Sequence, residues 1–207
     1  MARSWASRKV PRHREKGRLG SSCLELLPVS TYGLVTAWPP AHARMLVMTA
    51  QLRAAEPRDV EAIVGLIREL AEFEHLSDGL ELTSGALMRH LFGARPVVEA
   101  VVAELEGKLV ACALFFTNYS TFLGKPGLYL EDLYVQPEHR GTGVGQALLR
   151  HLAGLAVARE YGRFEWSVLD WNEGAIGFYK RMGASVLPEW RTCRVTGEAL
   201  DQLALQK

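Results

Sequence analysis

The amino-acid sequence predicts a single α/β domain in which helices flank a β-sheet. The chain has 207 residues, which suits one domain of about 150 residues with an additional segment. Apolar residues make up 48% of the chain, enough to build a core, and charged residues make up 23%, which is typical of a soluble protein. From residue 51 onward, segments with the hydrophobic period of a helix alternate with segments typical of strands.

The first 44 residues differ from the rest of the chain. They hold eight Lys and Arg against two acidic residues, a net charge of +6, and four prolines interrupt any regular period. Three interpretations stay open: a disordered extension or a start assigned too far upstream, with translation beginning at Met45 or Met48; a targeting peptide; or a nucleic-acid-binding tail. We favour the first, predict a domain over residues 45–207, and do not expect nucleic acid as a partner.

Charge, cysteines and hydropathy restrict the class of protein further. Residues 45–207 hold 16 basic against 21 acidic residues, and this mildly acidic body suits a cationic substrate. No apolar run approaches the roughly 20 residues that span a bilayer, so we expect no membrane partner. The three scattered cysteines, Cys23, Cys112 and Cys193, fit a reducing, cytoplasmic location, and no Cys/His spacing predicts a metal site.

The predicted domain begins with a short strand and two helices. Residues 51–54 form the strand, and Pro57 suits the first turn of the helix that follows. Apolar residues then recur every three or four positions as far as Phe73, which is typical of an amphipathic helix. A polar loop over residues 76–85 leads to a second helix, about Ser84–Leu91.

Strands and two further helices complete the pattern. Glu106-Gly107 predicts a hairpin turn, and Asn172 and Gly183 are typical of a helix N-cap and C-terminal stop. In order, the remaining predicted elements are strands 97–105 and 108–117, a loop 118–127, a strand 128–135, a helix 143–161, a strand 164–169, a helix 172–182 and a strand 191–195.

The segment Arg140-Gly141-Thr142-Gly143-Val144-Gly145 stands between a predicted strand and a predicted helix. Glycines let backbone N–H groups approach a ligand closely, and a helix N-terminus favours an anion. Arg140 adds a positive charge suited to phosphate. The spacing meets neither the dinucleotide-binding pattern nor the Walker A pattern. By itself the segment predicts a pyrophosphate cradle, with a plain glycine-rich turn as the alternative.

Arg140-x-x-Gly143-x-Gly145 resembles the R/Q-x-x-G-x-G/A signature of the GNAT acetyltransferase superfamily. Residues 170–184 resemble the second coenzyme-binding half of that family. Residues 129–132 and 171–180 are most similar to the diamine (spermidine/spermine) acetyltransferase branch, which includes thialysine acetyltransferases. The resemblance implies a GNAT fold with a mixed, splayed β-sheet flanked by helices, acetyl-CoA as cosubstrate, no metal, and a homodimer.

The resemblance also implies which residues hold acetyl-CoA. The pyrophosphate would bind the main-chain N–H groups of Arg140, Gly141, Thr142, Gly143, Val144, Gly145 and Gln146. The pantetheine arm would pair with the strand edge at Leu133, Tyr134 and Val135, where an N–H would polarise the thioester carbonyl. The other side of the coenzyme would be lined by Asn172, Glu173, Gly174 and Ala175.

Two residues are implied for the chemistry. Tyr179 would be the general acid, because a phenol with a pKa near 10 stays protonated at neutral pH; a core tyrosine is the alternative. Glu131 would bind the ammonium group and accept its proton, with a solvated strand charge as the alternative. By strand alternation Glu131 shares a face with Leu133, and Asp132 shares the other face with Tyr134, so only one acid faces the substrate.

Phe73 and Glu74 are implied at the amine pocket, although a solvated helix end is the alternative, and Trp190 is a further candidate wall. We therefore expect direct acetyl transfer from acetyl-CoA to a primary amine of a small cationic substrate, such as a diamine, a polyamine or a lysine-like amino acid. The alternatives are a GNAT enzyme acting on protein lysines, N-terminal amines or an antibiotic, and a non-catalytic acetyl-CoA-binding regulator.

Overall fold

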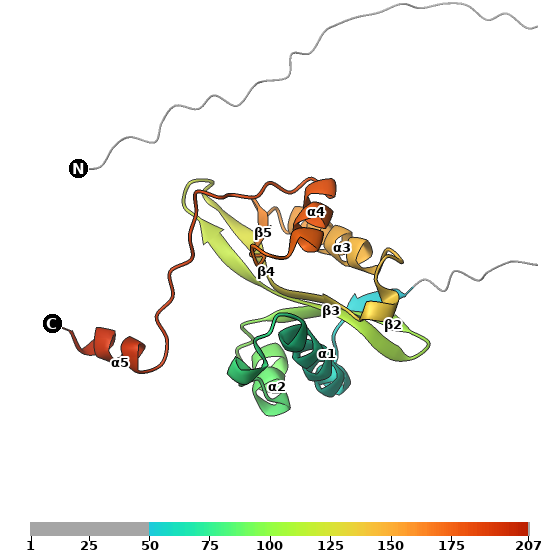
Figure 1. Ribbon diagram of the computed structural model, residues 1–207, viewed down its shortest axis with the longest axis horizontal. Coiled ribbons are helices and arrows are strands. Elements are labelled where there is room, and N and C mark those ends of the chain that lie inside the picture. Colours follow the sequence, from blue (N-terminus) through green and yellow to red (C-terminus); the bar gives the residue numbers. More distant parts are fainter. Residues whose placement is uncertain (1–49, 207) are drawn as a thin grey trace, which may run out of the picture. The chain divides into compact units, whose positions relative to one another are not determined.

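A five-stranded mixed sheet forms the centre of a computed structural model that describes residues 50–206 (Figure 1). The strands follow in the order of the chain: β1 (Gln51–Ala54), β2 (Glu99–Leu105), β3 (Lys108–Ser120), β4 (Lys125–Val135) and β5 (Phe164–Trp166). Neighbouring strands are antiparallel except β4 and β5, which are parallel. The interpretations of residues 1–44, and the domain boundary at residue 45, lie outside the described residues and stay predictions.

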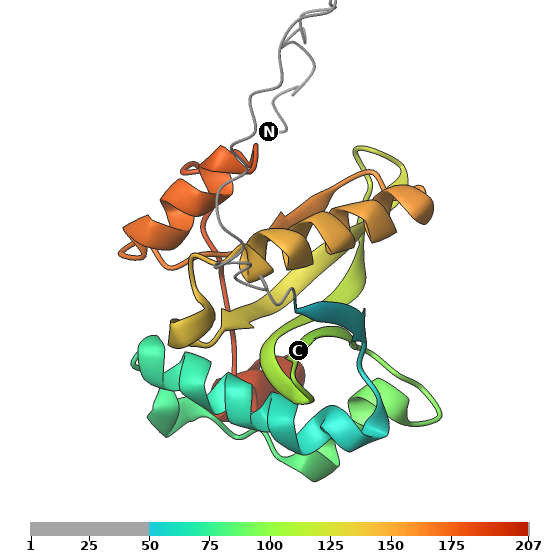
Figure 2. The same cartoon turned by 90° about the vertical axis from the view of Figure 1, so that its right-hand side faces the viewer.

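Helices cover both faces of the sheet (Figures 1 and 2). On one face lie α1 (Val60–Phe73) and α2 (Ser84–Phe92), and on the other lie α3 (Val144–Ala158) and α4 (Glu173–Arg181). Short 3₁₀ turns over Pro57–Asp59, Ser77–Gly79 and Pro137–His139 join these elements, and α5 (Glu198–Leu205) ends the described chain. No helix within residues 50–206 combines the length and the apolar character needed to cross a membrane.

Strand alternation divides the apolar side chains between two cores. Along β2, Ala100 and Val102 face α1 and α2, whereas Val101 and Ala103 face α3. Each helix contributes one apolar stripe to its own core, as its hydrophobic period predicts. The α/β class and the sheet flanked by helices are therefore confirmed.

β4 and β5 separate after three paired residues. Leu128 pairs with Phe164 and Leu130 with Trp166, but β5 ends there while β4 continues to Val135. A bulge lies at the same point, because β3 residue Leu114 opposes Asp132 and the next residue, Phe115, opposes Leu130, which leaves Glu131 without a partner. The sheet is thus splayed, as predicted, and one edge of β4 beyond Leu130 is free of β5.

Two sequence-based predictions of strands need correction. Residues 118–127 are not a loop, since Asn118 pairs with Gly127 and Ser120 with Lys125, and only 121–124 connect the strands. Backbone pairing across the hairpin overrides the turn propensity of Asn118 and Pro126, whereas Gly124 lies in the turn with a φ of 63°. The predicted last strand, 191–195, is absent: these residues are exposed and no strand of residues 50–206 lies along them, so no ladder can form.

Candidate active site

The free edge of β4 is the first part of the site. From Asp132 to Val135, β4 pairs with β3 on one side, while none of the described strands pairs with its other side. The N–H and C=O groups on that side need partners. An extended ligand with amide groups can add to such an edge as a further strand does. Leu133, Tyr134 and Val135 therefore lie where the sequence predicted contact with a pantetheine arm.

The loop before α3 has a geometry that favours glycine at two positions. Gly141 and Gly143 have φ angles of 76° and 95°, in the left-handed region that side chains disfavour, and Gly143 is the N-cap of α3. The Thr142 hydroxyl donates to the His139 carbonyl at 2.6 Å and fixes the loop between them. The first N–H groups of α3, on Val144, Gly145 and Gln146, have no carbonyl of their own helix to bind, which is the arrangement that favours an anion.

The Arg140 side chain is exposed, and it lies along the end of β4. Its Nε donates to the Val135 carbonyl at 2.9 Å, and its guanidinium carbon lies 5.0 Å from the ring centre of Phe73 and 5.5 Å from that of Tyr134. The sequence predicted a charge available to phosphate. The structure instead places the guanidinium on two aromatic rings, at the end of β4.

Helix α4 holds Tyr179 against the core of the α3 face. The Asn172 side chain accepts a hydrogen bond from the Ala175 N–H at 3.1 Å, so the predicted N-cap is confirmed. The Tyr179 ring packs edge-on against Trp166 with 5.0 Å between ring centres. Burial raises the pKa of Tyr179, and the negative charge of Glu74 raises it further. Tyr179 therefore stays protonated and can donate a proton.

The end of α1 presents Phe73 and Glu74 through a Schellman motif. The Leu76 N–H binds the Ala71 carbonyl at 2.8 Å and the His75 N–H binds the Glu72 carbonyl at 3.1 Å. His75 adopts a left-handed conformation, with φ 60°, where glycine is usual. Glu74 is half-buried, and burial raises its pKa.

Replacing His75 with glycine is expected to stabilise the protein by about 1 kcal/mol, because glycine removes the left-handed strain of a Cβ. Urea unfolding of both proteins measures the difference. The matched control is His90→Gly on the exposed face of α2, where glycine is expected to destabilise by about 1 kcal/mol. A loss of stability in His75→Gly would contradict the proposed strain.

Asp132 is the half-buried acid of the site, whereas Glu131 is exposed at the bulge. Asp132 opposes Leu114 and lies on the α1 face with Tyr134, as alternation predicted. Burial, and to a lesser extent the charges of Glu131 and Glu74, raise the pKa of Asp132 to about 6. A carboxyl group with this pKa can accept a proton near neutral pH.

Side chains of three elements influence one another's pKa values. Glu74 on α1 raises the pKa of both Asp132 on β4 and Tyr179 on α4, so its carboxylate lies within electrostatic reach of each. Beside it, the rings of Phe73 and Trp171 lie 5.9 Å apart. Acidic groups next to aromatic faces can bind a cation. The arrangement suits a protonated amine next to a proton acceptor and a proton donor.

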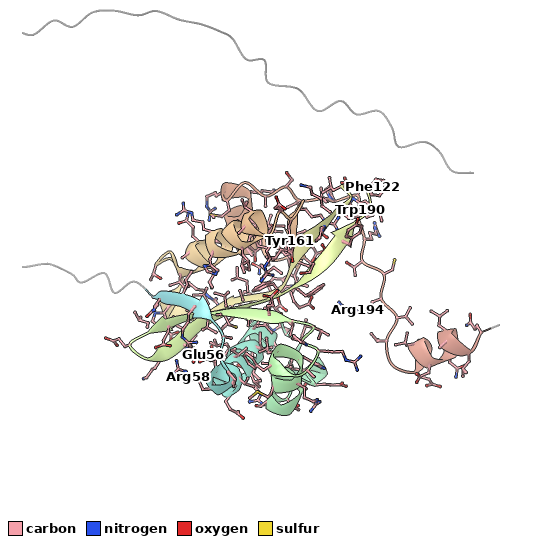
Figure 3. All side chains as sticks on the ribbon, turned by 180° about the vertical axis from the view of Figure 1, so that it is seen from behind. Glu56, Arg58, Phe122, Tyr161, Trp190 and Arg194 are labelled. Atoms are coloured by element: carbon pink, nitrogen blue, oxygen red, sulfur yellow. The ribbon has the colours of Figure 1, made fainter. Side chains whose placement is uncertain are left out.

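Sequence reasoning chose Glu131 over Asp132 and overlooked Trp171. Strand alternation could have indicated Asp132, because it places Asp132 on the same face as Tyr134. The bulge at Glu131 is not visible in the sequence. Trp171 stands directly before the N-cap Asn172, which is its only sequence signal. Trp190 is 70% exposed (Figure 3), and the structure does not bring it to the site.

Cys112 is fully buried in the core, and burial raises the pKa of its thiol far above the ordinary range. Within residues 50–206, no three His, Cys, Asp or Glu side chains are grouped to hold a metal ion.

Comparisons with known proteins cover most of the described chain. A family model described as the acetyltransferase (GNAT) family matches residues 63–184. A thialysine N-epsilon-acetyltransferase of Sus scrofa is 38% identical over 164 residues, which cover 74% of this chain and 96% of the relative. An L-ornithine N5-acetyltransferase of Arabidopsis thaliana is 34% identical over 201 residues, covering 75% of this chain and 88% of the relative.

Solved structures agree in fold. An integron cassette protein from the mobile metagenome of V. cholerae is similar with a TM-score of 0.65 and 26% sequence identity, over 77% of this chain and 99% of that one. Every residue of the site, from Phe73 to Tyr179, lies inside the segment that the family model matches.

Proposed function

This chain belongs to the acetyltransferase (GNAT) family and is an acetyltransferase, and on that premise we propose that it transfers acetyl from acetyl-CoA directly to a primary amine of a small cationic substrate. The resemblance to the branch that contains thialysine acetyltransferases is confirmed by the relatives. The observation that supports this proposal most is the free edge of β4 beyond Leu130, where Asp132 lies within electrostatic reach of Glu74, as Tyr179 on α4 does.

Acetyl-CoA fits the residues of the coenzyme side. The glycine geometry at positions 141 and 143 leaves the first N–H groups of α3 open to the pyrophosphate. The edge of β4 at Leu133, Tyr134 and Val135 can pair with the pantetheine amides, and residues 172–175 at the start of α4 would line the opposite side. An N–H of this edge would hydrogen-bond the thioester oxygen as negative charge develops on it.

The proposed reaction assigns one proton to each of two groups. Asp132, directly or through water, accepts a proton from the ammonium group, and the freed amine attacks the thioester carbonyl. The C–N bond forms, the C–S bond breaks, and Tyr179 donates its proton to the departing thiolate. The second proton of the attacking nitrogen passes to the tyrosinate through water, which gives the neutral amide and restores the phenol. Glu131 at the bulge and Glu74 would attract the ammonium group. No covalent acetyl-enzyme is formed.

The acidic side chains favour an acceptor with positive charge. Phe73 and Trp171 offer aromatic faces to such a cation. The two relatives are named for thialysine and L-ornithine, amino acids with a terminal amine, and we propose an acceptor of this class or a related diamine or polyamine. A homodimer and a cytoplasmic location stay predictions from the resemblance and the cysteines.

The test is a panel of amines with acetyl-CoA, followed by thiol release. It contains thialysine, L-lysine, L-ornithine, putrescine and spermidine, together with an aminoglycoside and a lysine peptide with a blocked N-terminus. We expect turnover with at least one of the small cationic amines. The kcat/KM for the aminoglycoside and for the blocked peptide is expected to be less than a tenth of that value. Turnover of the peptide or the aminoglycoside alone would reject the proposed acceptor class and leave the family unchanged.

A further inference from the structure

The Arg140 side chain joins the coenzyme loop to the acceptor side of the site. Arg140 precedes the glycines that open α3, yet its guanidinium lies over Phe73, at the last turn of α1. The same guanidinium lies over Tyr134 and binds the Val135 carbonyl through Nε. One side chain therefore contacts the end of α1, the end of β4 and, through its own backbone, the loop.

A second contact holds the same two elements together. The Gln136 side-chain amide donates to both carboxylate oxygens of Glu69, at 3.1 and 3.3 Å. Tyr134 is only 5% exposed, and burial followed by the nearby Glu69 raises its pKa. Gln136 thus binds α1 directly, Tyr134 is buried against it, and the Arg140 guanidinium lies over the Tyr134 ring.

Phe73 is not fixed in this way. Its ring is 39% exposed, and its aromatic neighbour Trp171 is 49% exposed. A half-exposed ring gains little from burial, so the groups that contact it decide where it points. Arg140 on one side and Trp171 on the other make a continuous row from the coenzyme loop to the start of α4.

We propose that Arg140 is a positioning residue, whose guanidinium holds Phe73 in place for the acceptor, while backbone N–H groups alone bind the pyrophosphate. This inference rests on the proposed function and deepens it. A planar guanidinium stacks on aromatic rings and donates through a fixed fork, which an ammonium group does not do. Its Nε is already committed to Val135, which restricts how far the side chain can turn toward a phosphate.

Arg140→Lys separates positioning from phosphate binding, because lysine keeps the charge but loses the stack and the Nε contact. We expect KM for L-ornithine to rise about five- to twentyfold, the loss of a cation–π contact and a charge-assisted hydrogen bond. The Kd for coenzyme A is expected to change less than about threefold. Arg150→Lys, at an exposed position of α3, is the control and is expected to change neither quantity.

Arg140→Gln removes the charge and tests whether the Arg140 side chain binds phosphate. If the side chain binds phosphate, this variant loses about tenfold or more in affinity for coenzyme A and nothing for pantetheine, which carries no phosphate. That result, with an unchanged KM for L-ornithine, would overturn the inference. We expect the affinities of Arg140→Gln for the two ligands to stay within about threefold of the wild type.

A double-mutant cycle tests the contact without any acceptor. Urea midpoints are measured for the wild type, Arg140→Lys, Phe73→Leu and the double variant. If Arg140 holds Phe73, the shift of the double variant is smaller than the sum of the two single shifts. Additive shifts would overturn the inference even if an amine is acetylated. A panel without turnover would reject the proposed function, and the cycle would still decide whether Arg140 contacts Phe73.

Discussion

Replacing Tyr179 with phenylalanine is expected to lower kcat by about 10²- to 10³-fold, with the Kd for coenzyme A within about threefold of the wild type. The phenol is the proposed donor to the departing thiolate, and burial together with Glu74 keeps it protonated. Phenylalanine keeps the ring that packs against Trp166, so the helix and its core contacts remain. The loss is therefore expected in the chemical step and not in binding, and steady-state kinetics with a saturating amine measure it.

Tyr161→Phe is the matched control. Its hydroxyl pairs with the Thr117 hydroxyl at 2.8 Å, beyond the end of α3 (Figure 3). Removing it is expected to leave kcat within about twofold. An unchanged kcat in Tyr179→Phe would exclude the role of this tyrosine as the acid, whatever the acceptor.

Replacing Asp132 with asparagine is expected to lower kcat/KM by about 10²-fold or more near neutral pH. The wild-type rate should rise about tenfold per pH unit below pH 6 and level off above it, because the pKa of Asp132 is raised to about 6 by burial and by its acidic neighbours. This acidic limb is expected to disappear in the variant. Glu131→Gln is the comparison, since it changes the adjacent carboxylate, which is exposed at the bulge.

Glu131→Gln is expected to lower kcat/KM less than about tenfold and to keep the acidic limb, because its charge attracts the amine without accepting the proton. If Glu131→Gln abolishes the limb and Asp132→Asn does not, the proton acceptor is Glu131. That outcome would support the role that the family resemblance implied for Glu131.

The raised pKa of Asp132 also makes the stability of the folded protein depend on pH. In the unfolded chain the pKa of an aspartate is near 3.8, and in the folded protein that of Asp132 is about 6. Between these pH values the folded protein holds a proton on Asp132 that the unfolded chain has released. The stability that protonated Asp132 contributes to the fold is therefore fully present below about pH 4 and is lost as the pH rises through 6. The free energy of unfolding of Asp132→Asn, relative to that of the wild type, is therefore expected to rise by about 2 to 3 kcal/mol from pH 4 to pH 8. Urea unfolding at the two pH values measures this gain.

Local signals in the sequence predicted most of the fold. Glu106 and Gly107 both have positive φ, 51° and 78°, as the predicted two-residue hairpin requires. Asn172 caps α4, and Gly183 follows it in a left-handed conformation with φ 95°. These devices depend on a few neighbouring residues, which is why sequence alone predicts them.

Features set by distant pairing were not predictable. The bulge at Glu131 depends on how β3 meets β4, and it decides which acid is buried. The predicted strand over residues 191–195 needed a neighbouring strand that the described chain does not offer, and α5 was not predicted. The contact between the Arg140 guanidinium and the Phe73 ring joins residues that are 67 positions apart in the chain. The motif alone indicated a charge for phosphate.

The acceptor class is tested most directly by kcat/KM for thialysine and for a blocked lysine peptide, measured side by side with acetyl-CoA. Both amines stand at the end of similar side chains, but the peptide lacks the free α-ammonium group of thialysine, which is a further positive charge that Glu74 and Glu131 would attract. We expect thialysine to be preferred by at least about tenfold in the wild type, and its kcat/KM to fall about 10²-fold in Asp132→Asn. A peptide acetylated as efficiently as thialysine, with no loss in Asp132→Asn, would contradict both the proposed substrate class and the site that carries it.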